Sequence, residues 1–200
     1  MISIRSATRA DVPELSGVLA RAFHDDPPFL WCLPDPDGRP RRLRRIFTTI
    51  LSREVLRHGA VQVAGQDDRI IGGALWVPPH RQQASTLRQL TAVPGFLRGF
   101  GRRIGYGSEL AAACAKAHPA EPHWYLYVLG VAPALQGEGV GAALLRSGLA
   151  RCDQERLPAY LESSKLGNVP LYQHFGFQPT GTIDLPAGAP EITTMWRPSA

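Results

Sequence analysis

The sequence predicts an α/β (α+β) fold in which a mixed, mostly antiparallel central sheet of about six or seven strands is flanked by helices. Three observations support this prediction. An N-terminal strand is followed by helical segments, two β-rich segments form a hairpin, and the chain then runs strand, helix, strand, helix, strand, strand. This order produces a sheet with both parallel and antiparallel neighbours that is covered by helices.

The first half of the chain contains the N-terminal strand, several helices and the hairpin. ISIRSA is expected to form the strand, and Thr8 with Asp11 provides an N-cap for a helix that ends near Phe23. HDDPPFLWCLPDPDGRP contains five prolines and is expected to be an irregular loop. An arginine-rich helix to about Arg57 then precedes the hairpin AVQVAGQDDRIIGGALWVPP. Prolines and glycines interrupt the helical pattern of residues 78–122.

The second half supplies the alternating strands and helices. HWYLYVLGV is expected to be a strand, GVGAALLRSGLARCDQE a helix, AYLESS a strand, and NVPLYQHF a short helix with Asn168 at its N-cap. Two further strands are expected near residues 177–184 and 191–196. At 200 residues and 44% hydrophobic, the chain is long enough for one domain with a sizeable core, and no linker or repeat divides it.

Charge and hydropathy restrict the class of partner. The formal net charge is +5, and the densest basic segment is GRPRRLRRIF, residues 38–47. Because no interleaved aromatic residues accompany it, a solvated helix face is favoured over a nucleic-acid-binding patch. No segment approaches the roughly 20 apolar residues of a membrane span, and the N-terminus lacks the apolar stretch of a signal peptide. We therefore expect a cytoplasmic protein with no nucleic-acid or membrane partner.

The cysteines and histidines do not form a recognisable framework. Cys32, Cys114 and Cys152 lie far apart without a CxxC pair, and the six histidines form no HExxH motif. Neither a disulfide framework nor a metal site is therefore predicted.

The stretch QGEGVGAALL, residues 136–145, places glycines at three alternate positions immediately before an apolar helix. Glycine is entropically costly at a helix start, so this spacing indicates a backbone that lies close to a ligand. A helix N-terminus offers unpaired N–H groups and the positive end of a dipole, which suit a phosphate. A flexible loop without a ligand is the alternative.

A dinucleotide-binding fold is a further alternative for this stretch. Residues 137–142 match GxGxxA, and Glu162 follows about 20 residues later. In that fold the first glycine follows its strand directly, whereas APALQ separates Val131 from Gly137 here. Too few residues remain for a second nucleotide-binding half, so the context argues against this fold.

The spacing QxxGxG, from Gln136 to Gly141, follows a strand that ends in LGVAP. With this pattern the sequence resembles the GNAT acetyltransferase superfamily, whose pyrophosphate-binding loop has such a motif between the fourth strand and the next helix. NVPLYQHFGF is similar to a later helix and strand of the superfamily. The C-terminal half is most similar to the puromycin N-acetyltransferases, through LGVAPALQGEGVG, AYLESS and NVPLYQHFGF. The resemblance covers almost the whole chain and is weakest over residues 78–122.

The resemblance implies one acetyltransferase domain, residues 1–200, with an acceptor-side half (1–120) and an acetyl-CoA-binding half (121–200). It also implies a splayed and bulged fourth strand, and Gly130 is compatible with that bend. Acetyl-CoA would be the co-substrate, with its pantetheine arm along this strand and its pyrophosphate on the loop. The residues implied to bind it are Leu129, Gly130, Val131, Gln136, Gly137, Glu138, Gly139, Val140, Gly141, Ala142 and Asn168.

The resemblance also implies that Tyr172 is the general acid that protonates the departing CoA thiolate. A phenol with a free pKa of about 10 suits a thiolate of similar proton affinity. On the residues alone, Tyr172 is a core aromatic flanked by Leu171 and Phe175. Asn168 lies four residues earlier, so both side chains are expected to face the cofactor.

The acceptor amine must lose a proton, and Glu162 is the candidate base, acting through water. Burial within AYLESS is expected to raise the pKa of its carboxyl group. The alternative is a structural carboxylate satisfied by backbone N–H groups between splayed strands. Weaker candidates for the base are His24, Asp25, Asp26 and His123.

The acceptor is expected to be the primary amine of a small molecule other than puromycin. Residues 23–39 and 78–103 would contact it, and these segments agree least with the puromycin N-acetyltransferases. A protein lysine or N-terminus is an alternative acceptor, and a catalytically silent acyl-CoA-binding module is an alternative function. The sequence leaves the oligomeric state open, a homodimer included.

Overall fold

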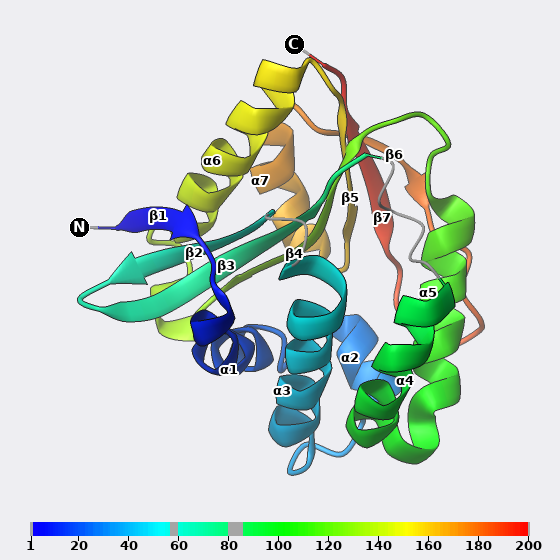
Figure 1. Ribbon diagram of the computed structural model, residues 1–200. Helices are drawn as coiled ribbons and strands as arrows, with labels where there is room; N and C mark the ends of the chain where they lie inside the picture. Colours follow the sequence, from blue (N-terminus) through cyan, green and yellow to red (C-terminus); the bar gives the residue numbers. More distant parts are fainter. Residues whose placement is uncertain (1, 57–59, 80–85, 200) are drawn as a thin grey trace.

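The computed structural model describes residues 2–56, 60–79 and 86–199. The fold is organised around one seven-stranded sheet (Figure 1). The strand order is β1-β2-β3-β4-β5-β7-β6. All neighbouring strands are antiparallel except β4 and β5, which are parallel, as the sequence predicts for a mixed sheet. The strands are β1 (Ser3–Ser6), β2 (Val61–Gln66), β3 (Arg69–Val77), β4 (Trp124–Val131), β5 (Ala159–Ser163), β6 (Gln178–Thr182) and β7 (Thr193–Arg197).

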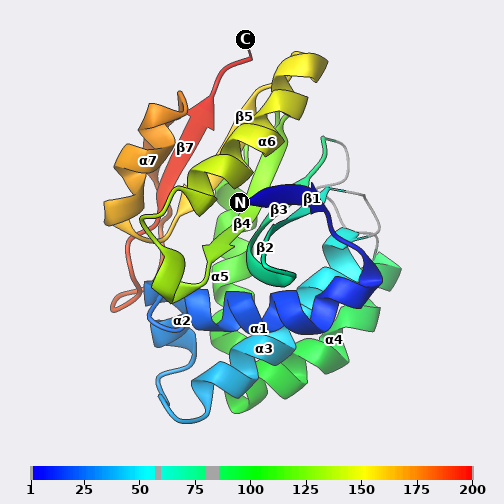
Figure 2. The ribbon, with the colours of Figure 1, turned by 90° about the vertical axis from the view of Figure 1, so that its left-hand side faces the viewer.

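Helices cover both faces of the sheet (Figure 2). One face carries α1 (Val12–Ala22), α2 (Pro27–Cys32), α3 (Arg39–Thr49), α4 (Thr86–Phe100) and α5 (Ile104–Ala117), and the other carries α6 (Val140–Glu155) and α7 (Val169–His174). Short helical turns occupy Arg9–Asp11, Ile50–Val55, Gly101–Arg103, Pro133–Leu135 and Leu166–Asn168.

Each face of the sheet has its own apolar core, because side chains alternate between the two faces along a strand. Leu75 belongs to the core under α1 and α3, whereas the next residue, Trp76, belongs to the core under α6. Leu15 and Phe47 are fully buried in the first core, and Leu144 is fully buried in the second.

The N-terminal elements confirm two local predictions. The backbone N–H of Thr8 donates to the Asp11 carboxylate at 2.7 Å, at the start of the first helical turn. The predicted hairpin forms from β2 and β3, and its two turn residues, Asp67 and Asp68, have φ angles of +49° and +58°. Two successive residues with positive φ match the backbone twist of a tight hairpin.

The prediction of an irregular loop in HDDPPFLWCLPDPDGRP is wrong for residues 27–32, which form α2. Pro27 and Pro28 occupy the first two helical positions, where a missing N–H leaves no bond unmade. The arginine-rich helix, expected to reach about Arg57, ends as α3 at Thr49 and continues as a wider turn to Val55. Residue 57 lies outside the described residues.

The interrupted helical pattern of residues 78–122 corresponds to two helices. A short turn at Gly101–Arg103 separates α4 from α5, and Pro94 lies inside α4. Residues 80–85 lie outside the described residues.

Strands β4 and β5 diverge, and this divergence positions the candidate site. They pair at only three positions, from Trp124 with Ala159 to Leu126 with Leu161, although both strands continue beyond them. The register between β3 and β4 shifts at the same level, so that Tyr127 has no residue opposite it. This β-bulge bends β4 away from β5. The fourth strand is therefore bulged and splayed, as the resemblance implies.

Candidate active site

The end of β4 presents backbone groups toward the space where β5 diverges. The N–H of Ala132 donates to the carbonyl of Ile71 at 2.8 Å, on the β3 side. Because successive residues of a strand turn their backbone groups to opposite sides, Gly130 also faces β3, whereas Leu129 and Val131 face the other way. An extended ligand arm could add to this edge in the manner of a strand.

Position 130 requires a glycine because of helix packing and not because of the expected bend in the strand. The bulge lies at Tyr127, whereas Gly130 pairs regularly with Gly73. A Cβ on Gly130 would lie 2.6 Å from Leu19 Cδ2 and 3.0 Å from a ring carbon of Phe23. The glycine is therefore required because α1 packs directly on the strand.

The loop after β4 has the geometry of an anion-binding turn. Gln136 donates its side-chain amide to the carbonyl of Val131 at 3.2 Å, which fixes the entrance of the loop. Gly137 and Gly139 have φ angles of +87° and +80°, which favour glycine. A Cβ at either position would meet no protein atom within 4 Å, so the space above both residues is open.

Helix α6 begins directly at this loop. Its first hydrogen bond runs from the N–H of Ala143 to the carbonyl of Gly139 at 3.0 Å. The N–H groups of Val140, Gly141 and Ala142 precede that bond and point out of the helix end. Together with the helix dipole, they offer donors suited to an anion, which is the kind of position that the glycine spacing predicts. The N–H of Glu138, in contrast, donates to Leu135 at 3.4 Å.

Tyr172 lies in the α6/α7 core, where its side chain is 8% exposed and its ring meets Phe177 edge-on at 6.2 Å. Burial and the negative charge of Asp26 raise the pKa of the phenol, so its hydroxyl keeps its proton. Asn168 is at the N-cap of α7, as predicted, but its exposed side chain makes no capping hydrogen bond. The two residues therefore differ in burial.

Glu162 lies on the opposite face of β5 from Leu161, which belongs to the same core as Tyr172. Its carboxylate accepts hydrogen bonds from the hydroxyl of Tyr125 at 2.6 Å and from that of Tyr160 at 3.2 Å. Burial raises the pKa of Glu162, and the bonds from Tyr125, Tyr160 and Cys114 oppose that rise. The carboxylate is thus held by side-chain donors on β4, β5 and α5 rather than by the backbone N–H groups of the structural alternative.

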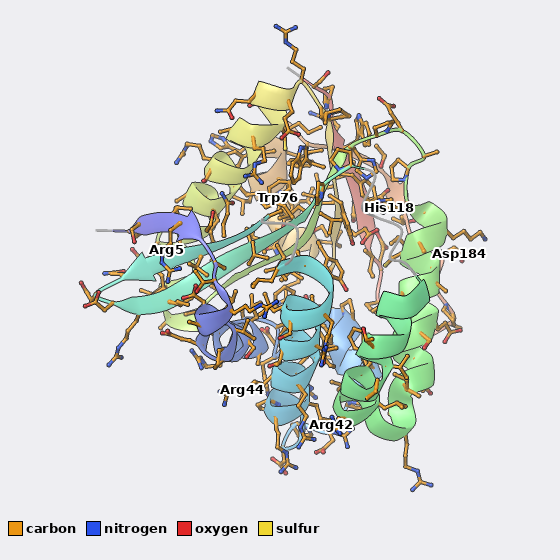
Figure 3. The ribbon with its side chains drawn as sticks, in the orientation of Figure 1. Arg5, Arg42, Arg44, Trp76, His118 and Asp184 are labelled. Carbon is orange, nitrogen blue, oxygen red and sulfur yellow. The ribbon has the colours of Figure 1, made fainter. Side chains whose placement is uncertain are left out.

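Two histidines adjoin this tyrosine network. His118 follows α5 and lies between that helix and the sheet (Figure 3). Its ring contacts Tyr125 and Tyr160 edge-on at 4.8 and 5.0 Å, and its Nε2 lies 3.0 Å from Nε2 of His123. Burial lowers the pKa of His118 to about 4. No sequence pattern singles out His118, because no spacing links a helix end to a distant strand.

Asp26 is a buried carboxylate whose charge acts on Tyr172. Its side chain is 4% exposed and accepts a hydrogen bond from the hydroxyl of Ser164 at 2.5 Å. Burial raises its pKa to about 6, opposed by the Ser164 bond and the charge of Lys165. Among the side chains whose burial the structure describes, it is the only acidic one that is buried. From the sequence, Asp26 is a weaker candidate for the general base than Glu162, since its neighbours suggest a solvated acidic loop.

The described parts of the chain contain no metal-binding cluster and no membrane-spanning helix. No group of three or more His, Cys, Asp or Glu side chains there is arranged to hold a metal ion. None of the helices in residues 2–56, 60–79 and 86–199 is both long and apolar enough to cross a membrane.

The chain is similar in sequence to a known protein family and to several curated proteins. The model of the acetyltransferase (GNAT) family matches residues 21–177. An uncharacterized N-acetyltransferase of Schizosaccharomyces pombe is 32% identical over 178 residues, which cover 84% of this chain and 70% of that protein. A mycothiol acetyltransferase of Streptomyces griseus is 37% identical over 164 residues, 72% of this chain and 52% of the relative. The chain thus spans about half of that relative's length.

A solved structure agrees with the fold over the whole chain. The crystal structure described as histone acetyltransferase HPA2 and related acetyltransferase, from Corynebacterium glutamicum, is 32% identical to this chain. The alignment covers 100% of this chain and 97% of that one, with a TM-score of 0.78. The family model covers most of the chain, and two of the relatives are 32% identical over most or all of it, so the chain belongs to the GNAT family of acetyltransferases.

Proposed function

We propose that this chain transfers the acetyl group of acetyl-CoA to the primary amine of a small molecule, by direct attack in a ternary complex. The observation that carries the proposal is the loop between β4 and α6, where open space lies above Gly137 and Gly139. This loop continues from the unpaired edge of β4, so one surface presents donors for a diphosphate and a backbone edge for an extended arm.

In this proposal, the chain grips the coenzyme mainly through its backbone. The amides of Gly137, Gly139 and the first turn of α6 bind the diphosphate, and Leu129 and Val131 pair with the pantetheine arm. Gln136 supports the loop through its bond to Val131. Gly130, Glu138 and Asn168 stay predicted contacts, and Gly130 faces β3 in the structure. Residues 121–200 would thus bind acetyl-CoA, and residues 1–120 the acceptor.

In the proposed chemistry, the general acid and the general base lie on opposite faces of β5. The amine nitrogen attacks the thioester carbonyl, the carbon–nitrogen bond forms, and the carbon–sulfur bond breaks. Tyr172 donates its proton to the departing thiolate, and Glu162 accepts the proton that the amine loses. The hydroxyl of Tyr125 lies 2.6 Å from Glu162 and is placed to pass this proton to the carboxylate. Solvent then restores the protonation states of both side chains.

The names of the relatives support two classes of acceptor. The mycothiol acetyltransferases are named for mycothiol rather than for a protein, which favours the proposal. The Corynebacterium glutamicum structure is described as a histone acetyltransferase and related acetyltransferase, which favours the alternative of a protein lysine or N-terminus. The likeness to the puromycin N-acetyltransferases, the cytoplasmic location and a homodimer stay predictions of the sequence.

The test of the proposed function is thiol release from acetyl-CoA in the presence of a panel of primary amines, with a library of lysine-containing peptides in parallel. Turnover with metabolite-sized amines supports the proposal. Signal from peptides alone supports the protein-acceptor alternative. Tight binding of acetyl-CoA without turnover of any amine or peptide supports a silent acyl-CoA-binding module and contradicts the proposal.

A further inference from the structure

Asp26 is a buried carboxylate that makes no ion pair with any described residue. Lys165 pairs with the neighbouring Asp25, with Nζ 2.8 Å from Oδ1. The buried guanidinium of Arg39 donates instead to three backbone carbonyls, those of Leu33, His24 and Pro34. A buried charge without a partner is costly, so its retention points to a role beyond stability.

The usual local role of such a residue is also unfilled. Asp26 occupies the N-cap position of α2, where an aspartate normally accepts a hydrogen bond from the first turn of the helix. The Asp26 side chain makes no such bond. It turns instead toward β5, where the hydroxyl of Ser164 donates to Oδ2. No hydrogen bond to Oδ1 occurs within the described part of the chain.

The position of Asp26 connects the two diverging strands. The last turn of α1 packs on Gly130 of β4 through Leu19 and Phe23, and Asp26 follows three residues after Phe23. Ser164 directly follows β5. The carboxylate therefore lies where β4 and β5 separate, and its charge acts on the phenol of Tyr172. If Tyr172 serves the sulfur, Asp26 therefore lies within electrostatic reach of the reacting thioester.

We propose that Asp26 receives the positively charged nitrogen of the acceptor, and thereby selects alkylammonium compounds over neutral nucleophiles of the same shape. The inference rests on the proposed function and names the residue that reads the acceptor's charge. Ser164 holds Oδ2 and leaves Oδ1 for the ammonium group. Because the carboxylate is buried, its attraction for a cation is less screened than that of the exposed Asp25.

The test compares charged and neutral probes in direct binding. Putrescine, 2-phenylethylamine and their alcohol counterparts, 1,4-butanediol and 2-phenylethanol, are titrated calorimetrically into the full chain saturated with CoA. The expected result is that at least one amine binds the wild type at least tenfold more tightly than its alcohol. Asp26→Asn is expected to abolish this preference, whereas Asp25→Asn, which removes the exposed neighbour, is expected to keep it.

A fold control separates this role from a structural one. Asp26→Asn removes an unpaired buried charge, so its melting temperature at pH 7.5 is expected to equal or exceed that of the wild type. A lower melting temperature together with lost CoA affinity would indicate a structural role and overturn the inference. Ser164→Ala, which keeps the charge, is expected to retain the amine preference.

The outcomes distinguish this inference from the proposed function. Amine binding that depends on Asp26, without thiol release by any amine, keeps the inference and contradicts the proposed function. Thiol release with an acceptor KM unchanged in Asp26→Asn keeps the proposed function and overturns the inference. The inference is also overturned if no amine binds the wild type more tightly than its alcohol.

Discussion

The side-chain amide of Gln136 donates to the backbone carbonyl of Val131 at 3.2 Å and ties the glycine loop to the end of β4. The strand edge and the amides at the start of α6 are therefore parts of one connected surface. If the loop holds the diphosphate, the distance along the pantetheine arm determines where the thioester lies. The location of the chemistry thus depends on the loop.

Gly139→Val is predicted to raise the dissociation constant of CoA at least tenfold, because its Cβ would occupy the space of the phosphate. Gly188→Val is the matched control. Gly188 has a φ of +85°, close to the +80° of Gly139, and lies in the connection between β6 and β7. A Cβ at Gly188 would likewise meet no atom within 4 Å. Both variants are expected to lose about 1–2 kcal/mol of unfolding free energy from backbone strain.

Calorimetric titration with CoA and urea denaturation measure the two effects separately. An equal loss of CoA affinity in both valine variants would show that strain, rather than contact with the phosphate, is responsible. Undiminished affinity in Gly139→Val would contradict the loop assignment.

Tyr172→Phe is predicted to lower kcat roughly 100-fold with an unchanged dissociation constant for acetyl-CoA, because the departing thiolate loses its proton donor. Since the pKa of Tyr172 is raised, its phenol stays protonated in the wild type up to at least about pH 10. Steady-state thiol release with the best amine of the panel measures kcat. Tyr106→Phe on α5 is the control and is expected to change kcat less than twofold. An unaltered kcat in Tyr172→Phe would remove Tyr172 from the mechanism.

Glu162→Gln is predicted to lower kcat by about 100-fold or more while the enzyme still binds acetyl-CoA. A base must be ionised, and the pKa of Glu162 is raised above its ordinary value of 4.5. The kcat of the wild type should therefore fall as the pH drops toward that raised pKa, and the variant should lose this acidic limb. The profile is measured from pH 5 to 9.

The tyrosine network provides the control for Glu162. Tyr160→Phe removes the longer of the two hydroxyl bonds and leaves the carboxylate in place. It is expected to retain the acidic limb. If Glu162→Gln instead loses stability and activity in equal proportion, Glu162 is a structural carboxylate.

The stability of the wild type relative to Asp26→Asn is predicted to depend on pH. The pKa of Asp26 is raised from 3.8 to about 6, so the folded state binds this proton more tightly than the unfolded chain does. The contribution of protonated Asp26 to the free energy of unfolding is fully present below about pH 4. Up to about 3 kcal/mol of it is lost as the pH rises through 6. The other charges near Asp26, on Asp25 and Lys165, are common to both proteins, and the phenol of Tyr172 is neutral.

Urea denaturation of both proteins at pH 4 and pH 8 measures this difference. From pH 4 to pH 8, the free energy of unfolding of the wild type is expected to fall relative to that of Asp26→Asn. A difference that does not change with pH would mean that Asp26 titrates normally in the folded protein.

Gly130→Ala is predicted to destabilise the protein by about 1–3 kcal/mol, because the new methyl group would press Leu19 and Phe23 away from β4. Gly17→Ala, within α1, has its nearest neighbour at 3.7 Å and should gain up to about 1 kcal/mol. Thermal denaturation measures both. A neutral Gly130→Ala would contradict the packing explanation for this glycine.

Local patterns predicted much of the fold. The hairpin follows from alternating apolar segments around Asp67 and Asp68, and the helix after Gly139 follows from the apolar run that succeeds the glycines. Both signals lie within a few residues of the elements they specify. The loop prediction for residues 27–32 is wrong because it treats proline as a helix breaker. The N–H groups of the first helical turn have no partner within the helix, so prolines are tolerated there.

The candidate site was predictable only where its residues are close in sequence. The glycine loop is contiguous, so its geometry could be anticipated from Gln136 to Ala142. The partners of Glu162 come from β4, β5 and α5, and Asp26 meets Ser164 across 138 residues. Such contacts depend on how strands and helices are arranged in three dimensions, which no local spacing records. The burial of Asp26 and the position of His118 therefore required the structure.

A crystal structure of the chain with bound CoA shows directly whether the glycine loop holds the diphosphate. We expect diphosphate oxygens within hydrogen-bond distance of the amides of Gly137, Gly139 and the first turn of α6, and the thiol beside Tyr172. A coenzyme bound with its diphosphate away from this loop, or with its sulfur remote from Tyr172, would contradict it.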